Sequence, residues 1–277
     1  MRKLILTLCL AFIALLAYAA PRDTVRILAI GNSFSVDAVE EHFYQIASNE
    51  GVTVIVGNMY IGGCSLERHV TNLRADAPAY NYRKMTADGV LTKTPDVAIS
   101  KALRDEAWDF VSVQQASPLS GKPESYVPYL KELTDYVKAH VPEAEIMFQM
   151  TWAYDHDSTH KKFPDYNKDQ VYMYNCILSA VKKATADVGI KVIIPSGTAV
   201  QNARTTALVD RMTRDGYHMS KPQGRYTVAC TWVEKVLGKK VKGNEYCPEG
   251  MTPEECRLAQ KAAHAAVRKP FKVTVIR

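Results

Sequence analysis

The sequence lacks most of the features that would place it outside the ordinary globular class. Apart from one run near the N-terminus, no segment of the 277 residues approaches the ~20 apolar residues that span a bilayer. The 14 glycines and 13 prolines are ordinary numbers, which excludes collagen-like and linker-like chains. Six cysteines are few for a chain this long, and its length alone permits a large core, so folding needs neither a disulfide framework nor a metal.

The composition instead indicates a folded domain with a modest positive charge. Hydrophobic residues make up 47% of the chain, which excludes a disordered protein, and no internal repeat or low-complexity linker divides it. The formal net charge of +6 is a weak hint of an anionic partner. The basic run at residues 238–242 lacks the interleaved aromatic residues of nucleic-acid-binding segments, so we expect no nucleic-acid partner.

The first 19 residues read as a signal peptide. A short basic head precedes the apolar run LILTLCLAFIALL, and a small-x-small cleavage site ends at Ala19. An uncleaved membrane anchor is the alternative, but the run is shorter than a bilayer-spanning helix requires. We therefore expect an exported domain, periplasmic or secreted, that comprises residues 20–277 and is not inserted in the membrane.

Loss of this peptide changes the cysteine count and the charge. Cys9 leaves with it, so five of the six cysteines remain, and two basic residues leave too, so the net charge falls from +6 to +4. An odd number of cysteines leaves at least one thiol unpaired within a monomer. Cys247 and Cys256 flank a short turn and are the expected disulfide. The other three are expected to be packing residues: Cys64, Cys176 and Cys230.

Short apolar runs alternate with amphipathic segments along the rest of the chain. The runs predict five strands, at residues 25–30, 52–56, 108–113, 145–151 and 191–194. The first expected helix is capped by Ser35 and runs through Phe43 and Ile46, and the second runs from Pro95 to Leu103. Further helices are expected over residues 126–141, 169–188 and 221–237, and a last one begins at a capping box at Thr252. A last strand is expected at residues 271–276, whereas the polar stretch up to Thr94 has no assignable pattern.

Buried strands separated by helices are typical of a parallel sheet covered on both faces. We therefore expect a single α/β domain, a three-layer α/β/α sandwich around a mostly parallel five-stranded sheet. In such sheets, ligands bind beyond the carboxyl ends of the strands. Functional residues are therefore expected in the segments that follow the strands.

Two of these segments contain the parts of a nucleophilic site. Ser33 lies where the first strand passes into a helix, so its hydroxyl is close to the positive end of a helix dipole. Asp215 and His218 lie three residues apart in one loop, where the histidine can take the serine proton and the aspartate can orient the imidazole. Taken singly, a polar residue at a strand end is usually a cap or a turn former.

Two further segments can donate hydrogen bonds to an oxyanion. At Gly62 and Gly63 the absence of a side chain lets a backbone N–H approach a ligand closely. A glutamine amide at the end of the third strand can donate as well, and the choice between Gln114 and Gln115 stays open because one step along a strand reverses the facing. Residues expected to contribute to substrate binding are Asn32, Gln114, Trp152 and Tyr154.

Together these blocks resemble the SGNH (GDSL-like) hydrolase family over about residues 25–237. The strongest parts are VRILAIGNSFS and DGYHMSKPQGRY. The resemblance implies that Ser33 is the nucleophile, His218 the base and Asp215 the acid, with an oxyanion hole formed by Ser33, Gly63 and Gln115. It also implies a flavodoxin-like sheet and no metal or organic cofactor. The whole pattern is similar to an uncharacterised exported bacterial group related to carbohydrate acetylesterases.

The sequence departs from the family pattern at two positions. Asn32 replaces the aspartate of the first block, which bears on local hydrogen bonding rather than on the mechanism. The third block resembles the Q-G-E-S variant of carbohydrate acetylesterase relatives more than the usual G-x-N-D. We therefore expect an exported serine esterase that removes acyl groups, O-acetyl above all, from a small or polymeric carbohydrate ester. A non-catalytic glycan-binding protein and a lipase- or thioesterase-like hydrolase are the alternatives.

A cluster of Asp155, His156, Asp157 and His160 offers a weaker candidate metal site. His156 and His160 are four residues apart, which suits two metal ligands on one face of a helix. The surrounding segment YDHDSTHKK instead reads as a polar loop followed by lysines, so no metal site is expected there. This loop is better placed to line a substrate cleft.

Overall fold

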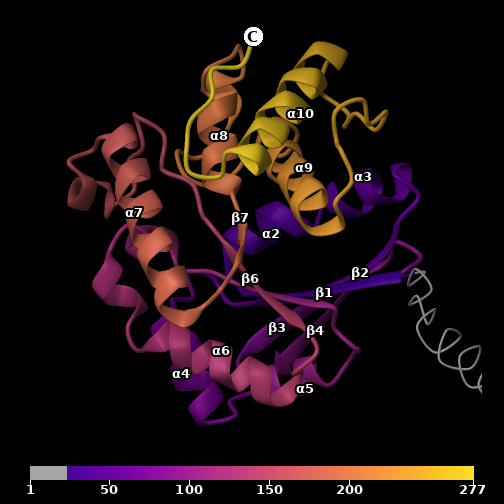
Figure 1. Cartoon of the computed structure of the whole chain (residues 1–277), viewed down its shortest axis with the longest axis vertical. Coiled ribbons are helices and arrows are strands. Elements are labelled where there is room, and N and C mark those ends of the chain that lie inside the picture. Colours follow the sequence, from indigo (N-terminus) through magenta and orange to yellow (C-terminus); the bar gives the residue numbers. More distant parts are fainter. Residues whose placement is uncertain (1–23) are drawn as a thin grey trace, which may run out of the picture.

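The computed structural model describes residues 24–277, so the predicted signal peptide and its cleavage after Ala19 lie outside the described residues. One seven-stranded sheet forms the centre of the domain (Figure 1). Its strands are β1 (Thr24–Gly31), β2 (Thr53–Tyr60), β3 (Tyr80–Met85), β4 (Leu91–Val97), β5 (Phe110–Val113), β6 (Glu145–Gln149) and β7 (Val192–Ile194). The α-helices are α2 (Ser33–Val39), α3 (Phe43–Asn49), α4 (Leu66–Arg74), α5 (Ile99–Leu103), α6 (Tyr129–His140), α7 (Gln170–Val188), α8 (Ser196–Ala203), α9 (Gln223–Leu237) and α10 (Pro253–Arg268). Short 3₁₀ turns are η1 (Ser117–Leu119), η2 (Pro123–Tyr126), η3 (Phe163–Tyr166) and η4 (Val209–Arg211).

The strands follow the order β4-β3-β2-β1-β5-β6-β7. The five strands from β2 to β7 in this order are parallel, as the apolar runs predict, and the layered α/β class is confirmed. The expected number of strands is wrong, because β3 and β4 add an antiparallel hairpin beside β2. Most of β4 is exposed, so the hairpin carries no apolar run by which the sequence could reveal it.

Helices cover both faces of the sheet. α4, α5 and α6 lie on one face, and α2, α3, α8, α9 and α10 lie on the other (Figure 1). α7 packs against α6 and the η2 turn. β1 is the central strand, and its residues from Ile27 to Gly31 are buried because apolar neighbours lie on both sides.

Two expected helices differ from the observed ones. The helix expected to run from Ser35 through Phe43 is broken into α2 and α3, and Asn32 rather than Ser35 is the N-cap of α2. The Ser35 hydroxyl is buried and donates instead to Asn58, at 2.8 Å. Pro95 lies within β4, where an edge strand tolerates its missing N–H, so α5 begins only at Ile99.

The C-terminal segment is not the expected strand. Residues 271–276 join no ladder and run beside α8 instead. The Thr274 N–H donates to Asn202 Oδ1 at 2.7 Å, and the Ile276 N–H donates to Thr205 Oγ1 at 3.0 Å. Side chains on and just after α8 therefore satisfy backbone groups that a sheet partner would otherwise bind.

Other local predictions are confirmed. Thr252 and Glu255 form a reciprocal capping box at the start of α10. Cys247 and Cys256 form a disulfide with an S–S distance of 2.06 Å. The remaining cysteines of the described range are free: Cys64 and Cys230 are buried, and Cys176 is half-buried. Within residues 24–277, no helix has both the length and the apolar character needed to cross a bilayer.

Candidate active site

Ser33 is held at the start of α2 by the residue before it. The Asn32 side chain accepts a hydrogen bond from the Phe34 N–H at 3.0 Å and donates one to the Cys64 carbonyl at 3.0 Å. Asn32 therefore caps α2 and ties it to the turn after β2, which is the local role that its replacement of aspartate suggested. The Ser33 N–H lies in the first helical turn, where no intrahelical acceptor is available.

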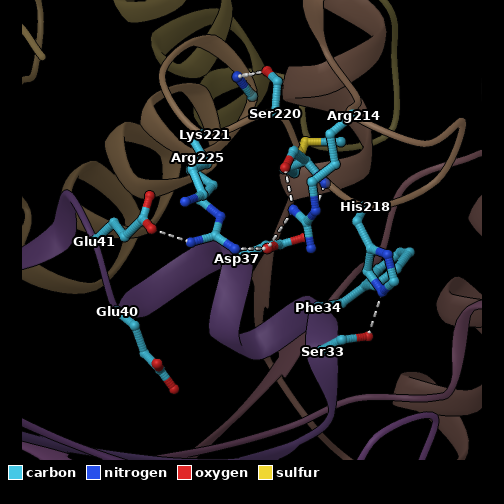
Figure 2. A network of polar contacts seen from close by, with 12 residues as sticks. Ser33, Phe34, Asp37, Glu40, Glu41, Arg214, His218, Ser220, Lys221 and Arg225 are labelled. Carbon is cyan, nitrogen blue, oxygen red and sulfur yellow. Dashed lines mark hydrogen bonds and ion pairs between the residues drawn. The ribbon is translucent and has the colours of Figure 1, made fainter. Parts of the chain in front are cut away.

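Ser33, His218 and Asp215 form a continuous hydrogen-bonded relay. His218 Nε2 lies 2.9 Å from Ser33 Oγ, and His218 Nδ1 lies 2.7 Å from Asp215 Oδ2 (Figure 2 shows the first of these contacts). With Nδ1 donating to the carboxylate, Nε2 is free to accept the serine proton. The structure therefore brings together all three residues expected to carry the chemistry.

The Asp215 carboxylate also organises its own loop. Its Oδ1 accepts from the backbone N–H groups of Tyr217 at 3.2 Å and of His218 at 2.8 Å. Although partial burial acts in the opposite direction, hydrogen bonds from the side chain and backbone of His218 and from the backbone of Tyr217 hold the pKa of Asp215 below its usual value. The carboxylate is therefore ionised at neutral pH.

Asp37 links the helix that begins at Ser33 to the loop that carries His218. It lies one helical turn after Ser33, and its side chain is 0% exposed. One carboxylate oxygen pairs with Arg225 at 2.6 Å and with Arg214 at 3.1 Å. The other accepts from the backbone N–H of Met219, the residue after His218, at 2.9 Å. A buried carboxylate needs such partners, and here they fix the loop that carries His218.

Trp152 fixes the other side of the same loop. Its indole Nε1 donates to the Tyr217 carbonyl at 2.7 Å, and its ring stacks on Phe34 with centroids 4.1 Å apart and planes 4° apart. Phe34 in turn meets the His218 ring edge-on at 5.9 Å. Phe34 therefore packs between the His218 ring and the Trp152 indole.

A third support comes from the segment after β6. The Asp155 N–H donates to the Gly216 carbonyl at 2.8 Å, and the Thr213 hydroxyl donates to the Asp155 carboxylate. Gly216 has φ +86°, and a Cβ there would lie 2.9 Å from Ser158 Cα, so only glycine fits this turn without displacement. Buried Arg204 pairs with the same carboxylate and completes this support.

Gly63 lies in the turn after β2. Its φ of +62° is in the left-handed region, and a Cβ there would have no atom within 4 Å. Within residues 24–277, no group accepts a hydrogen bond from the Gly63 N–H. The turn is closed by the Cys64 N–H, which donates to the Ile61 carbonyl at 3.2 Å. The Gly63 N–H is therefore available to a ligand.

The two glutamines after β5 have different surroundings. Gln115 Nε2 donates to the carbonyl and the hydroxyl oxygens of Ser125, at 2.9 and 3.1 Å, so both of its amide hydrogens are engaged. The expected donation from Gln115 to an oxyanion is therefore wrong for this conformation. Gln114 Nε2 donates to Asn32 Oδ1 at 2.9 Å, which leaves one amide hydrogen uncommitted beside the cap of Ser33.

Two residues expected to bind substrate do not line an open surface. Trp152 and Tyr154 are both 0% exposed. Trp152 supports Tyr217, and the Tyr154 hydroxyl lies 2.9 Å from Ser117 Oγ. Both therefore act from beneath the site, and the prediction that they line a cleft is wrong because their rings pack into the core.

Two other reactive groups are unsuited to the chemistry. Burial raises the pKa of the Cys64 thiol to about 12, and its neighbour His69, 3.5 Å away, has a pKa lowered by burial to about 3. This pair stays neutral near pH 7 and does not form a thiolate. No group of three or more metal-ligating side chains is placed to hold an ion within residues 24–277.

Sequence reasoning did not identify Asp37, Arg214 or Arg225, and it considered Asp155 only as part of a rejected metal cluster. Asp37 has a recognisable signal, since it is an acidic residue among the apolar positions of a short helix. The arginines and Asp155 have none, because their partners lie far away in the chain.

Solved structures place the fold among known hydrolases. A protein from Slackia heliotrinireducens, described as a candidate SGNH hydrolase, is 24% identical with a TM-score of 0.53, over 76% of this chain and 98% of that one. A mutant of an acetyl-xylooligosaccharide esterase from Geobacillus stearothermophilus is 13% identical with a TM-score of 0.50, over 78% and 95%. At these identities the likeness concerns the fold. No curated protein matches the chain significantly.

A much more similar structure carries a family name. It is the crystal structure of a DUF4886 family protein from Bacteroides uniformis, which is 53% identical with a TM-score of 0.90 and covers 91% of this chain and 98% of that one. The model of that family, described as a domain of unknown function, matches residues 26–266. This chain therefore belongs to the DUF4886 family.

Proposed function

We propose that this protein is an exported serine esterase of the SGNH type that removes acyl groups, O-acetyl above all, from carbohydrate. The observation that carries the proposal is the Ser33–His218–Asp215 relay, with distances of 2.9 and 2.7 Å, at the carboxyl edge of a parallel sheet. Such a relay can generate a serine nucleophile at neutral pH. Export rests on the basic and apolar character of the first 19 residues.

The proposed reaction has two halves. Ser33 Oγ attacks the ester carbonyl while His218 Nε2 takes its proton, and Asp215 stabilises the imidazolium. The N–H groups of Ser33 and Gly63 hold the oxyanion, and the uncommitted amide hydrogen of Gln114 is the third donor. His218 then protonates the departing alcohol. In the second half, His218 takes a proton from water, which attacks the acyl-enzyme and releases the acid.

Carbohydrate is the proposed alcohol for two reasons. Export would give the protein access to polysaccharide, and the third block is of the glutamine type. A fold neighbour is described as an acetyl-xylooligosaccharide esterase, which is compatible with this substrate class. A lipase-like enzyme would differ by preferring longer acyl chains.

The test combines active-site labelling with a substrate panel. A fluorophosphonate is expected to label Ser33, as mapped by peptide mass spectrometry, and labelling is expected to disappear in Ser33→Ala and His218→Ala. Acetate release from acetylated xylan, acetylated pectin and aryl acetates is then compared between wild type and Ser33→Ala. Equal turnover by the two proteins, or labelling at another serine, would contradict the proposal.

A further inference from the structure

A hollow lies immediately behind the loop that carries Asp215 and His218. It has a volume of about 450 Å³ and is formed by the loop between β6 and α7. The polar residues that line it include His156, Asp157, His160, Lys161 and Lys168. We call it the lysine hollow. This volume lies within the range of pockets that hold small organic ligands, and a single sugar residue fits within it.

The hollow adjoins the candidate active site through direct contacts. Ser158, in its wall, packs against Gly216, where an added Cβ would lie 2.9 Å from Ser158 Cα. The His160 ring lies 4.8 Å from the Tyr217 ring, and the Tyr217 ring lies 4.2 Å from that of His218. One aromatic ring therefore separates the hollow from the base, a distance that a neighbouring residue of an oligosaccharide can bridge.

The charges around the hollow are unbalanced. Lys161 and Lys168 have no acidic partner within residues 24–277, and Asp157 is the one acidic residue of the lining. By contrast Lys162, on the same loop but outside the hollow, pairs with Asp165 at 4.0 Å. Two exposed lysines of the lining without a carboxylate partner, against one aspartate, favour an anionic ligand in the hollow.

His160 adds a directed donor. Its Nδ1 accepts a hydrogen bond from the backbone N–H of Lys162 at 3.1 Å, so the neutral ring carries its hydrogen on Nε2. Its ring is held against Tyr154 at 4.6 Å and against Tyr217 at 4.8 Å. The imidazole is therefore fixed in orientation before a ligand arrives.

The backbone that presents Lys168 is also fixed. Asn167 and Lys168 have φ values of +57° and +53°, a left-handed pair that non-glycine residues seldom adopt. Hydrogen bonds from their N–H groups to the carbonyls of Pro164, at 3.0 Å, and Phe163, at 3.2 Å, hold this pair in place. Uncommon backbone conformations that are held in this way tend to occur at functional sites.

We propose that the lysine hollow is a subsite for an anionic sugar residue, one that bears a carboxylate or a sulfate, next to the residue that carries the acyl group. Lys161 and Lys168 bind the anion, and His160 donates to a sugar oxygen. This inference rests on the proposed esterase function and narrows its substrate class to acidic oligosaccharides.

The test compares acidic and neutral substrates of the same length. Wild type, the double variant Lys161→Gln/Lys168→Gln and the control Lys162→Gln are assayed on acetylated oligogalacturonate, an acetylated sulfated oligosaccharide, acetylated xylo-oligosaccharide and an aryl acetate. We expect the double variant to lose about tenfold or more in kcat/KM on an acidic substrate, mainly through KM, and less than about twofold on the neutral ones. The acidic substrate that wild type prefers identifies carboxylate or sulfate as the recognised group. Equal losses on all substrates, or none on the acidic ones, overturn the proposal.

A binding measurement separates this inference from the esterase proposal. Titration calorimetry of the acidic oligosaccharides into Ser33→Ala needs no turnover. Affinity that is weakened by the lysine substitutions and by added salt supports the hollow even if wild type hydrolyses no ester. Unchanged affinity in the double variant, with unchanged thermal unfolding, overturns the hollow even if the aryl acetate is hydrolysed.

Discussion

The two segments that flank Ser33 are held in opposite ways. The loop with Asp215 and His218 is fixed by the buried carboxylate of Asp37, by the indole of Trp152 and by the Asp155 support. The turn with Gly63 has no side-chain support around the glycine itself and is held by backbone conformation and one bond from Asn32. Both a base and an oxyanion donor must be held in place, but a side-chain base is aimed by hydrogen bonds from other side chains, whereas a backbone N–H is aimed by the conformation of its own turn.

The largest loss of activity is expected from a substitution in the loop that carries His218. His218→Ala removes the group that accepts the serine proton, so kcat on an aryl acetate is expected to fall by about 10⁴-fold or more. Circular dichroism and the melting temperature are the control, because the ring is not part of the core. A variant that keeps more than about a tenth of wild-type activity would show that another group serves as base.

The next effect concerns the link between helix and loop. Asp37→Asn leaves Arg214 and Arg225 facing a neutral amide, so the loop with His218 is expected to lose its alignment. We expect kcat to fall about 10- to 100-fold with little change in KM, and the free energy of unfolding to fall by about 3 kcal/mol.

Glu41→Gln is the matched control for Asp37→Asn. Glu41 pairs with Arg225 at the outer end of the same network, where its side chain is 35% exposed (Figure 2). Its loss is expected to cost less than about 1 kcal/mol and to leave kcat unchanged. Similar kcat losses in the two variants would mean that total charge, rather than the buried link, positions the loop.

Two glycine substitutions test the contrast directly. Gly63→Ala and Gly216→Ala both place a side chain at positive φ, at +62° and +86°. Only the Cβ added in Gly216→Ala would also clash with a backbone atom, Ser158 Cα. Urea unfolding is expected to give losses of about 1 kcal/mol for Gly63→Ala and about 2–3 kcal/mol for Gly216→Ala. Equal losses of unfolding free energy in the two variants would contradict the proposed difference between the turn at Gly63 and the loop at Gly216.

The smallest effect is a pH dependence of stability. Because the folded-state pKa of Asp215 is lowered, its ionised form contributes stability that is fully present above the unfolded-state pKa and is lost as pH falls through the folded value. The side chain is 38% exposed, so solvent screening keeps this contribution below about 1 kcal/mol. Melting temperatures of wild type and Asp215→Asn, recorded from pH 7 down to pH 3, are expected to converge. A gap that widens toward acid would contradict the sign.

The sequence is informative where local pattern and chemistry coincide. Apolar runs predict the five parallel strands, and the rule that such sheets bind ligands at their carboxyl ends groups Ser33, Gly63 and His218 before any coordinates are known. The exposed hairpin of β3 and β4 could not be predicted from the sequence, because it has no apolar run. The direction in which the Gln115 side chain points could not be predicted either, because a shift of one residue along a strand reverses the direction of a side chain.

Supporting residues are harder to predict than reacting ones. Trp152 has the size and polarity of a sugar-binding residue. The structure instead shows it 0% exposed and stacked on Phe34. Asp37 and Arg225 are paired across 188 positions of the chain, and no local pattern predicts such a pairing. Residue type therefore indicates the chemistry, while tertiary packing decides which polar groups face the substrate.

The hydrogen bond between Ser33 and His218 joins residues 185 positions apart, and this has a consequence for folding. Contacts of such long range form late, because a long loop must close before they contribute. The first strands and their helices can assemble without the loop at Asp215, but the reactive serine cannot be activated until the last third of the chain has docked. Recovery of activity during refolding is therefore expected to lag behind recovery of secondary structure, which makes catalysis a reporter of complete folding.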